Sequence, residues 1–210
     1  MPSLGNFRDP VKEIFYIVLS ARTTDAQYRV THRNLMRAYP TLAELAKARV
    51  TDVRRCITSG GLDGIRARQC VRIARALIER CGPNPARYIR SLDPFAAYKF
   101  LADLPGMGPK SAFCVAMYSL GVDVFPVDAN VQRIAERMGA IRKGIEHRLA
   151  QRRLAAVAPD GRSRELHIAM VVHGRTVCLP VNPKCGACGL VDLCRRGRNA
   201  TATRGGAARG

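Results

Sequence analysis

The sequence lacks any hydrophobic run long enough to cross a membrane. Its longest apolar stretch, Ile14 to Ala21, falls far short of the roughly 20 residues that a spanning helix needs. Residues Met1 to Gly5 show no basic segment followed by an apolar one, so we expect no secretory signal. These two absences argue against a membrane protein and predict a cytoplasmic one.

Acidic residues are scarce. The chain of 210 residues has 16 Asp and Glu against 35 Lys and Arg, which gives a formal charge of +19 and a pI near 10.5. Such an excess attracts polyanions. Nucleic acid is the first expected partner and an anionic membrane surface the second, so we expect association with the nucleoid.

Alternating apolar and polar runs are also missing, so a sheet is not expected. Apolar residues recur instead at helical spacing, and the expected fold class is all-α. Helix starts are predicted at Thr24-Asp25, Thr41, Thr51 and Asp93-Pro94, helix ends at Gly60-Gly61 and Gly82, and a long helix from Ile65 to Arg80.

No large apolar residue follows Cys194. Such a segment buries too little surface to offset the entropy lost on ordering. The stretch from Arg195, and residues 197–210 in particular, is therefore expected to form a flexible basic tail.

A glycine-rich turn, Leu104-Pro105-Gly106-Met107-Gly108-Pro109-Lys110, separates two helical patterns. Gly106 and Gly108 permit positive φ and close backbone approach, and Pro109 suits the first position of a helix. N–H groups at such a helix start bind phosphate. The alternative is a plain connection between two helices.

Lys110 has two possible roles. A lysine in the first turn of a helix feels the positive end of the helix dipole, which disfavours its ammonium form. A neutral amine can form a Schiff base with a sugar carbonyl. The alternative, and the commoner one for such a lysine, is a simple cationic contact with phosphate.

Asp128 precedes a helical pattern formed by Val131, Ile134 and Met138. It is predicted to cap that helix. Beyond capping, its carboxylate could face the same cleft as Lys110, stabilise a cationic sugar and help to move protons.

Four cysteines lie close together near the C-terminus. Six, two and five residues separate Cys178, Cys185, Cys188 and Cys194, and in a reducing compartment this spacing predicts one metal centre. Four thiolates suit zinc or an iron–sulfur cluster equally. The remaining cysteines are expected to pack as core residues: Cys56, Cys70, Cys81 and Cys114.

The hairpin, the aspartate and the cysteine loop, in that order, resemble the endonuclease III family of helix-hairpin-helix DNA glycosylases. The resemblance extends from about Pro10 to Cys194. It implies a [4Fe–4S] cluster on the four cysteines and two lobes with a DNA cleft between them. Residues 20–125 would form a helical barrel with the hairpin, and residues 1–19 with 126–196 the cluster domain.

The resemblance also implies roles for single residues. Lys110 matches the lysine that attacks the sugar C1′, and Asp128 the aspartate that assists base departure. Leu62 falls where a wedge stands beside the flipped-out nucleotide, and ordinary core packing is its alternative. The expected DNA contacts are Arg22, Leu62, Gly106, Met107, Gly108 and Lys110.

Several residues depart from the family pattern. Arg22 replaces a glutamine, Asp63 an aromatic residue, Pro109 a basic residue, and Ala129-Asn130 a Thr-His pair. The sequence Asp-Ala-Asn instead resembles the branch that acts on thymine and uracil mismatches, although that branch commonly lacks the lysine.

The resemblance implies a monomeric glycosylase with abasic-site lyase activity. It would act on double-stranded DNA that contains damaged pyrimidines or abasic sites. Alternatives are a uracil or thymine mismatch glycosylase, an enzyme that is mainly an abasic-site lyase, a non-catalytic DNA-binding protein and a zinc-stabilised binding module.

The charge excess generates a prediction about salt. If binding neutralises about five phosphates, the logarithm of duplex affinity should fall with the logarithm of salt concentration at a slope of about −4 to −5. Fluorescence anisotropy across a salt series measures the slope, and a flat response would contradict the electrostatic interpretation.

Overall fold

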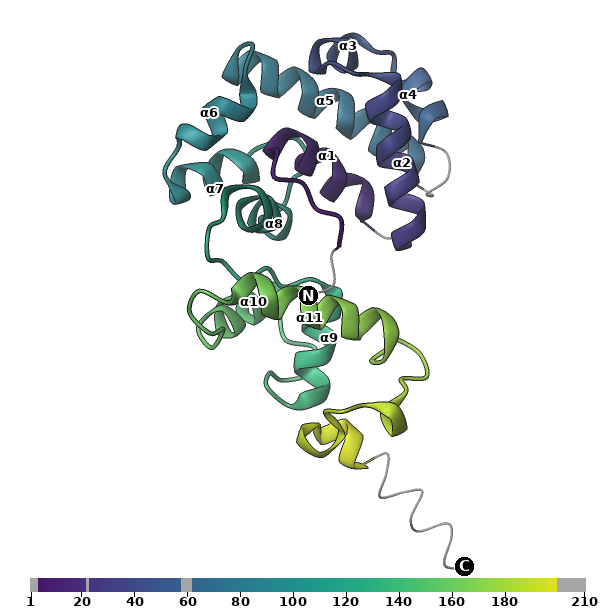
Figure 1. Cartoon of the computed structure of the whole chain (residues 1–210), viewed down its shortest axis with the longest axis vertical. Coiled ribbons are helices and arrows are strands. Elements are labelled where there is room, and N and C mark those ends of the chain that lie inside the picture. Colours follow the sequence, from purple (N-terminus) through teal and green to yellow (C-terminus); the bar gives the residue numbers. More distant parts are fainter. Residues whose placement is uncertain (1–3, 22, 58–61, 200–210) are drawn as a thin grey trace, which may run out of the picture. The chain divides into compact units, whose positions relative to one another are not determined.

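The computed structural model describes residues 4–21, 23–57 and 62–199. These residues form helices joined by loops, and no strand occurs among them (Figure 1). The predicted all-α class is therefore confirmed. The chain divides into two compact units, Gly5–Val122 and a second formed by Asp123–Gly210 with Met1–Leu4.

The larger unit consists of eight α-helices within the described residues. In chain order they are α1 (Pro10–Ser20), α2 (Asp25–Ala38), α3 (Leu42–Lys47), α4 (Val50–Cys56), α5 (Asp63–Cys81), α6 (Pro85–Ser91), α7 (Pro94–Ala102) and α8 (Pro109–Leu120).

Helix α1 lies at the centre of this unit and packs against α2, α5, α6 and α8. Every residue from Ile14 to Leu19 is buried, and a helix that is apolar on all sides belongs inside a core. The structure thus differs from the expected division, which assigned residues 1–19 to the cluster domain. The long apolar run of α1 needs partners on every side, and the neighbouring helices of the larger unit supply them.

Local capping explains most helix starts. Thr24 and Thr41 each form a capping box, and Asp93 accepts hydrogen bonds from the N–H groups of Phe95 and Ala96, as predicted. Gly82, with φ of +66°, ends α5. The predicted start at Thr51 is wrong by one residue, because α4 begins at Val50 after an Arg49 that forms no side-chain cap. The predicted stop at Gly60-Gly61 lies outside the described residues.

Besides a helical segment at residues 195–199, the described part of the smaller unit has its own core, three α-helices and two short 3-10 helices. These are α9 (Ala129–Met138), α10 (His147–Ala155), α11 (Ser163–Thr176), η2 (Cys185–Ala187) and η3 (Val191–Leu193). The core residues are Phe125, Val127, Val131, Ala135, Ile141, Ile145, Ala150 and Leu154.

The segment that follows Cys194 differs from its prediction. Residues 195–199 are helical. Gly197 packs so closely on η3 that an added Cβ would lie 2.9 Å from the Val191 carbonyl oxygen. A small residue, rather than a large apolar one, makes this contact, and the prediction of a flexible tail is therefore wrong for residues 195–199. Residues 200–210 lie outside the described part of the chain.

Across the described ranges, no helix has both the length and the apolar character needed to span a bilayer.

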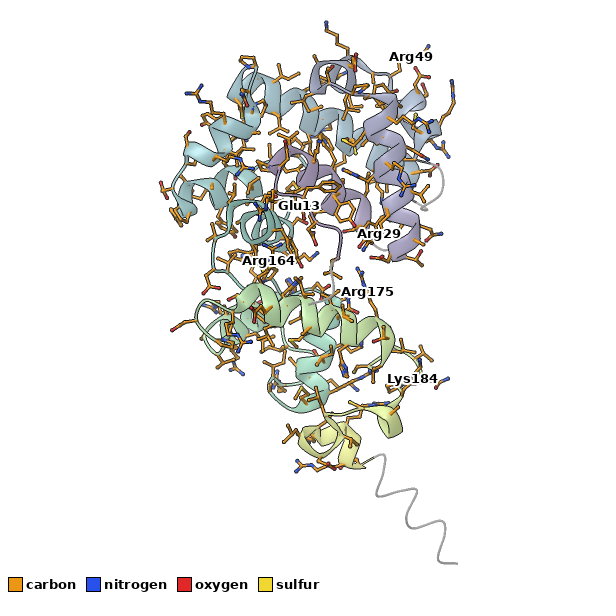
Figure 2. All side chains as sticks on the ribbon, viewed as in Figure 1. Glu13, Arg29, Arg49, Arg164, Arg175 and Lys184 are labelled. Carbon is orange, nitrogen blue, oxygen red and sulfur yellow. The ribbon has the colours of Figure 1, made fainter. Side chains whose placement is uncertain are left out.

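Glu13 on α1, labelled in Figure 2, is fully buried and anchors the segment before the helix. One carboxylate oxygen accepts a hydrogen bond from Asn6 Nδ2 at 2.5 Å and the other accepts one from the Phe7 N–H at 2.7 Å. Both oxygens therefore act as acceptors.

Replacing Glu13 by Gln should lower the free energy of unfolding by about 1–3 kcal/mol, because an amide offers only one acceptor oxygen to two buried donors. Urea denaturation measures the change. The matched change of exposed Glu79 to Gln should stay within about 0.5 kcal/mol of the natural protein. Equal effects of the two changes would contradict the anchoring role of Glu13.

Candidate functional site

The hairpin between α7 and α8 is a tight turn flanked by two buried side chains. The Met107 N–H donates to the Leu104 carbonyl oxygen at 2.9 Å, and both side chains are buried. Met107 was expected to contact DNA. Its side chain is only 4% exposed, so the backbone is the part of this residue that a ligand can reach.

Gly106 is required by both conformation and space. Its φ of +74° lies in the left-handed region that favours glycine. A Cβ there would also lie 2.7 Å from Gln69 Nε2, which donates to the Gly106 carbonyl oxygen at 2.8 Å. Gly108, by contrast, faces open space, since an added Cβ would meet nothing within 4 Å.

Lys110 is the second residue of α8, after the N-cap Gly108 and the first-position Pro109. Its residue surface is half-buried. The first-turn N–H groups of a helix have no acceptor within the helix and carry its positive dipole end. The turn therefore presents an open glycine surface, N–H donors and a lysine together, which is an arrangement suited to phosphate.

Leu62 is another residue of the larger unit that is predicted to contact DNA. It has a left-handed backbone, with φ of +51°, and 46% of its surface is exposed. Exposure on this scale excludes the core-packing alternative. The next residue, Asp63, accepts a hydrogen bond from Arg54 Nε at 2.9 Å, and this bond lowers the pKa of the Asp63 carboxyl group. Arg22 lies outside the described residues.

Asp128, in the smaller unit, is the N-cap of α9, as predicted. Its Oδ1 accepts the N–H groups of Asn130 and Val131, both at 2.8 Å. Its Oδ2 accepts Asn130 Nδ2 at 3.1 Å. Both oxygens are therefore held in one orientation by the first turn of the helix.

Sequence reasoning missed the residues that connect Asp128 to the cysteine loop. Arg133 Nη2 donates to Asn130 Oδ1 at 2.8 Å and to the Gly174 carbonyl oxygen at 2.9 Å, while its Nε donates to the Cys178 carbonyl oxygen at 3.1 Å. Burial lowers the pKa of the Arg133 guanidinium. Gly174 permits this packing, because a Cβ there would lie 2.8 Å from Asn130 Cβ.

The four clustered cysteines line one pocket, as their spacing predicted. Its empty space is about 420 Å³ counted out to the open mouth. No three cysteine, histidine or acidic side chains in the described ranges lie close enough together to ligate one ion directly. The thiols are instead distributed around the pocket, whose lining also includes Arg137, His173 and Leu190.

Polar groups around the pocket are directed at sulfur. Arg137 Nη1 donates to Cys178 Sγ at 3.2 Å, and the same guanidinium donates to the carbonyl oxygens of Leu179 and Pro180. The Gly197 N–H donates to Cys194 Sγ at 3.4 Å. A cation and an N–H group directed at cysteine sulfurs fit thiolate ligands, whose negative charge such donors stabilise. The donor set therefore fits an iron–sulfur cluster.

The other cysteines differ among themselves. Cys70 and Cys114 are buried core residues as predicted, and burial raises the pKa of Cys70 to about 12. Cys56 and Cys81 are only half-buried, so for these two the structure differs from the expected core packing. Both lie at helix ends, where neighbours cover only one side.

Comparison with known families decides between the possible interpretations of this site. Residues 15–159 match the model of the HhH-GPD superfamily base excision DNA repair proteins, and residues 178–194 match the iron–sulfur binding domain of endonuclease III. Endonuclease III of Thermotoga maritima is 31% identical over 200 residues, which are 93% of this chain and 89% of that protein. The chain belongs to the endonuclease III family.

Two further relatives bear on the site. The structure of a trapped endonuclease III–DNA covalent intermediate, an estranged-adenine complex, matches with a TM-score of 0.84 and 27% identity, over 95% of this chain and 90% of that one. The thymine/uracil-DNA glycosylase of Methanothermobacter thermautotrophicus is 25% identical over 190 residues, which are 89% of this chain and 82% of that protein.

Family membership makes this chain a DNA glycosylase of base excision repair, in a family in which abasic-site lyase activity is typical. The match over residues 178–194 also decides the metal centre in favour of a [4Fe–4S] cluster over zinc. Cys178, Cys185, Cys188 and Cys194 are the residues placed to hold the cluster.

Two glycine substitutions should separate the structural and binding roles of the hairpin. Gly106→Ala should lower the free energy of unfolding by about 1–3 kcal/mol through backbone strain and contact with Gln69. Gly108→Ala should cost less than about 1 kcal/mol but weaken duplex binding about tenfold, because its methyl group occupies the open surface.

Urea unfolding and anisotropy with a fluorescent duplex measure the two effects. A Gly108→Ala protein that binds DNA as tightly as the natural one would show that this surface is not used.

Proposed function

We propose that the enzyme removes damaged pyrimidines from duplex DNA and then cleaves the strand, with Lys110 as nucleophile and Asp128 as its carboxylate partner. The observation that carries the proposal is the position of Lys110. It stands in the first turn of α8, directly after the open Gly108 surface, where the hairpin would hold the phosphates beside the target sugar.

The proposed reaction has two stages. The Lys110 amine attacks the sugar C1′, the bond from C1′ to the base breaks, and the base leaves with the bonding electron pair and takes up a proton. The nitrogen then passes a proton by way of a carboxylate to O4′ as the C1′–O4′ bond breaks, which leaves a protonated Schiff base between C1′ and Lys110 Nζ. Loss of a C2′ proton expels the 3′ phosphate, which cuts the strand on that side. Water finally hydrolyses the imine and frees the Lys110 amine.

Asp128 would support both stages. The hydrogen bonds that its carboxylate accepts from Asn130 and Val131 fix the direction of that group. The aspartate side chain is also short, so the carboxylate has little freedom to move. A fixed negative charge stabilises positive charge that develops on the sugar, and a carboxylate in reach of the amine can accept and return protons. We therefore assign Asp128 to the same nucleotide as Lys110.

Leu62 would be the wedge beside the flipped-out nucleotide. Its exposure and its place directly before α5 support this role. A base inside a stacked duplex shields its sugar bond, so the enzyme must extrude the nucleotide before reaction. Arg22 would fill the gap left by the extruded base at the same step.

The cluster would shape the loop from Cys178 to Cys194 for DNA binding, and when bound it supplies structural cross-linking rather than hydrolysis. The proposed partner is double-stranded DNA with damaged bases or abasic sites. A monomer acting on the chromosome in the cytoplasm fits this substrate and the +19 charge.

A second candidate function is excision of uracil or thymine from mismatches. The Asp128-Ala129-Asn130 sequence and the similarity to a thymine/uracil-DNA glycosylase favour it. Duplexes that differ only in the lesion separate the candidates. Release of uracil or thymine opposite guanine faster than of an oxidised pyrimidine would favour the mismatch activity.

Borohydride trapping on a duplex with a single abasic site tests the Lys110 assignment. The natural protein should form a covalent adduct, because borohydride reduces the Schiff base to a stable amine, and Lys110→Ala should form none. Duplex binding and visible absorption by the cluster should persist in the variant.

An adduct that survives in Lys110→Ala would assign the chemistry to another amine. No adduct from a natural protein that is folded, cluster-loaded and DNA-bound would instead favour a lysine-independent glycosylase. If Lys110→Ala loses binding together with adduct formation, Lys110 acts only as a phosphate contact, as in a non-catalytic DNA-binding protein.

A further inference from the structure

The N-terminal part of α5 reaches three separate loops of the larger unit. Asp63, Arg66 and Gln69 follow one another at intervals of three residues, so they lie near one side of the helix. Each side chain bonds to a different partner far from it in sequence. The three partners belong to segments that the proposed function assigns to DNA contact or that border such a segment.

Asp63 holds the start of α5, directly after Leu62. Its carboxylate binds Arg54 in the last turn of α4, on the other side of the connecting loop. The Arg54 side chain is 60% exposed, so the pair contributes little to stability. Its consequence is geometric, since it fixes where α5 begins and therefore where the Leu62 backbone stands.

Arg66 holds the end of α1 at Ala21. It is only 3% exposed, and its guanidinium donates to the carbonyl oxygen of Ala21, the C-cap of α1. Burying a guanidinium is costly, and burial lowers its pKa. Because burial of this guanidinium is costly, its bond to the Ala21 carbonyl oxygen indicates that the position of Ala21 is important.

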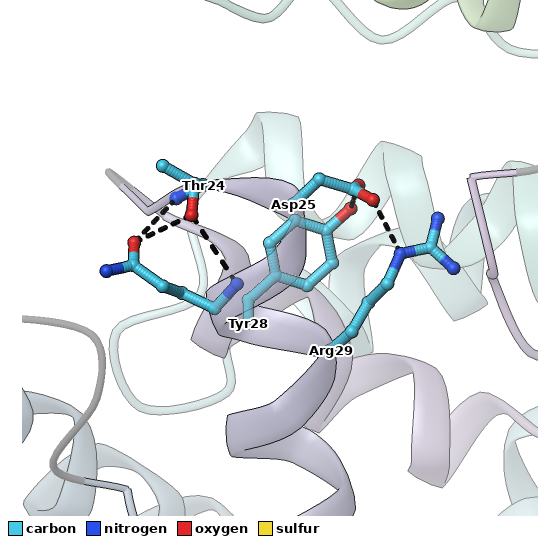
Figure 3. A network of polar contacts seen from close by, with 5 residues as sticks. Thr24, Asp25, Tyr28 and Arg29 are labelled. Carbon is cyan, nitrogen blue, oxygen red and sulfur yellow. Dashed lines mark hydrogen bonds and ion pairs between the residues drawn. The ribbon is translucent and has the colours of Figure 1, made fainter.

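The start of α2, at Thr24, is held independently. Thr24 closes a capping box with Gln27, and Asp25 accepts hydrogen bonds from the Tyr28 hydroxyl at 2.5 Å and from Arg29 Nε at 2.6 Å (Figure 3). Arg66 therefore holds Ala21 and the capping box holds Thr24. Between these two residues in the sequence is Arg22, which the proposed function assigns to the gap left by the extruded base.

Gln69 reaches the hairpin. Its Nε2 donates to the Gly106 carbonyl oxygen at 2.8 Å, and the absence of a Cβ at Gly106 makes this approach possible. The same helix therefore bonds to Arg54 at the end of α4, to the C-cap Ala21 of α1 and to Gly106 of the hairpin. The bonds of Asp63, Arg66 and Gln69 join residues that are 9, 45 and 37 positions apart in the sequence, respectively.

We propose that Arg66 is a positioning residue for base extrusion, which holds Ala21, at the end of α1, in register with Leu62 and the hairpin. This inference rests on the proposed DNA contacts of Arg22 and Leu62. Arg66 would act through Ala21 and not by contact with the reacting atoms. The hairpin would bind the strand, while Arg22 and Leu62 would enter the duplex together when the nucleotide leaves.

A residue with this role affects extrusion more than chemistry. Extrusion is most demanding for a stacked, paired base and least demanding for a nucleotide that has already lost its base. Loss of Arg66 should therefore slow release of a paired lesion while Schiff-base formation at an abasic site proceeds nearly as before. A merely structural role would lower both in proportion.

The test compares two variants. Arg66→Met keeps an unbranched side chain but removes every hydrogen-bond donor. Arg66→Lys keeps a positive charge and N–H donors but lacks the planar guanidinium group. Arg68→Met is the matched control, because Arg68 is exposed on the same helix and the change removes the same charge. Single-turnover base release, borohydride trapping on an abasic duplex, and 2-aminopurine fluorescence beside the lesion are measured for each protein.

Arg66→Met should release the base about ten- to a hundredfold more slowly and give a smaller rise in 2-aminopurine fluorescence, since small misplacements have effects of this size. Trapping should stay within about twofold, and Arg66→Lys should recover part of the rate. Where the Met variant does not fold, the Lys variant decides by the same comparison.

Base release in the Arg66 variants equal to that of Arg68→Met would overturn the proposal, and so would a proportional loss of trapping in a folded variant. Failure of the natural protein to trap an abasic site is a different result, because it contradicts the proposed role of Lys110 instead.

Discussion

Helix N-termini fix the positions of both groups assigned to the chemistry. Lys110 stands in the first turn of α8 and Asp128 caps α9. A helix start directs several N–H groups to one point and holds short side chains in place. At Lys110 these groups face an open glycine surface, whereas at Asp128 two of them are satisfied by the carboxylate itself. The same local structure would therefore serve phosphate binding in one unit, and it orients a charge in the other.

A buried arginine, Arg66, and a half-buried one, Arg133, extend this local order over longer distances. Arg66 bonds the Ala21 carbonyl oxygen, and Arg133 bonds carbonyl oxygens of α11 and of the cysteine loop. Each guanidinium presents several donors in a rigid fork, so one side chain can fix a loop that has no regular structure of its own. In the smaller unit, Asn130 connects Arg133 to Asp128, which relates the orientation of the carboxylate to the loop that holds the cluster.

The features predictable from the sequence are local ones. The caps at Thr24, Thr41, Asp93 and Asp128 depend on a few adjacent residues, and the metal site depends on cysteine spacing over one short loop. The contacts of Arg66, Gln69 and Arg133 join residues 37 to 45 positions apart, and no periodicity marks them. Burial of Met107 and the central place of α1 likewise depend on tertiary packing. The family resemblance pointed to the reacting residues but not to the side chains that hold them.

Lys110 and Asp128 are proposed to act on one nucleotide. A double-mutant cycle in single-turnover base release, with Lys110→Ala, Asp128→Asn and both together, tests this most directly. Groups that act as a unit give non-additive losses. The account predicts that the double variant is slower than the worse single variant by no more than about threefold, while all three proteins bind duplex DNA and keep the visible absorption of the cluster. A double variant whose loss equals the product of the two single losses would contradict a shared reacting nucleotide.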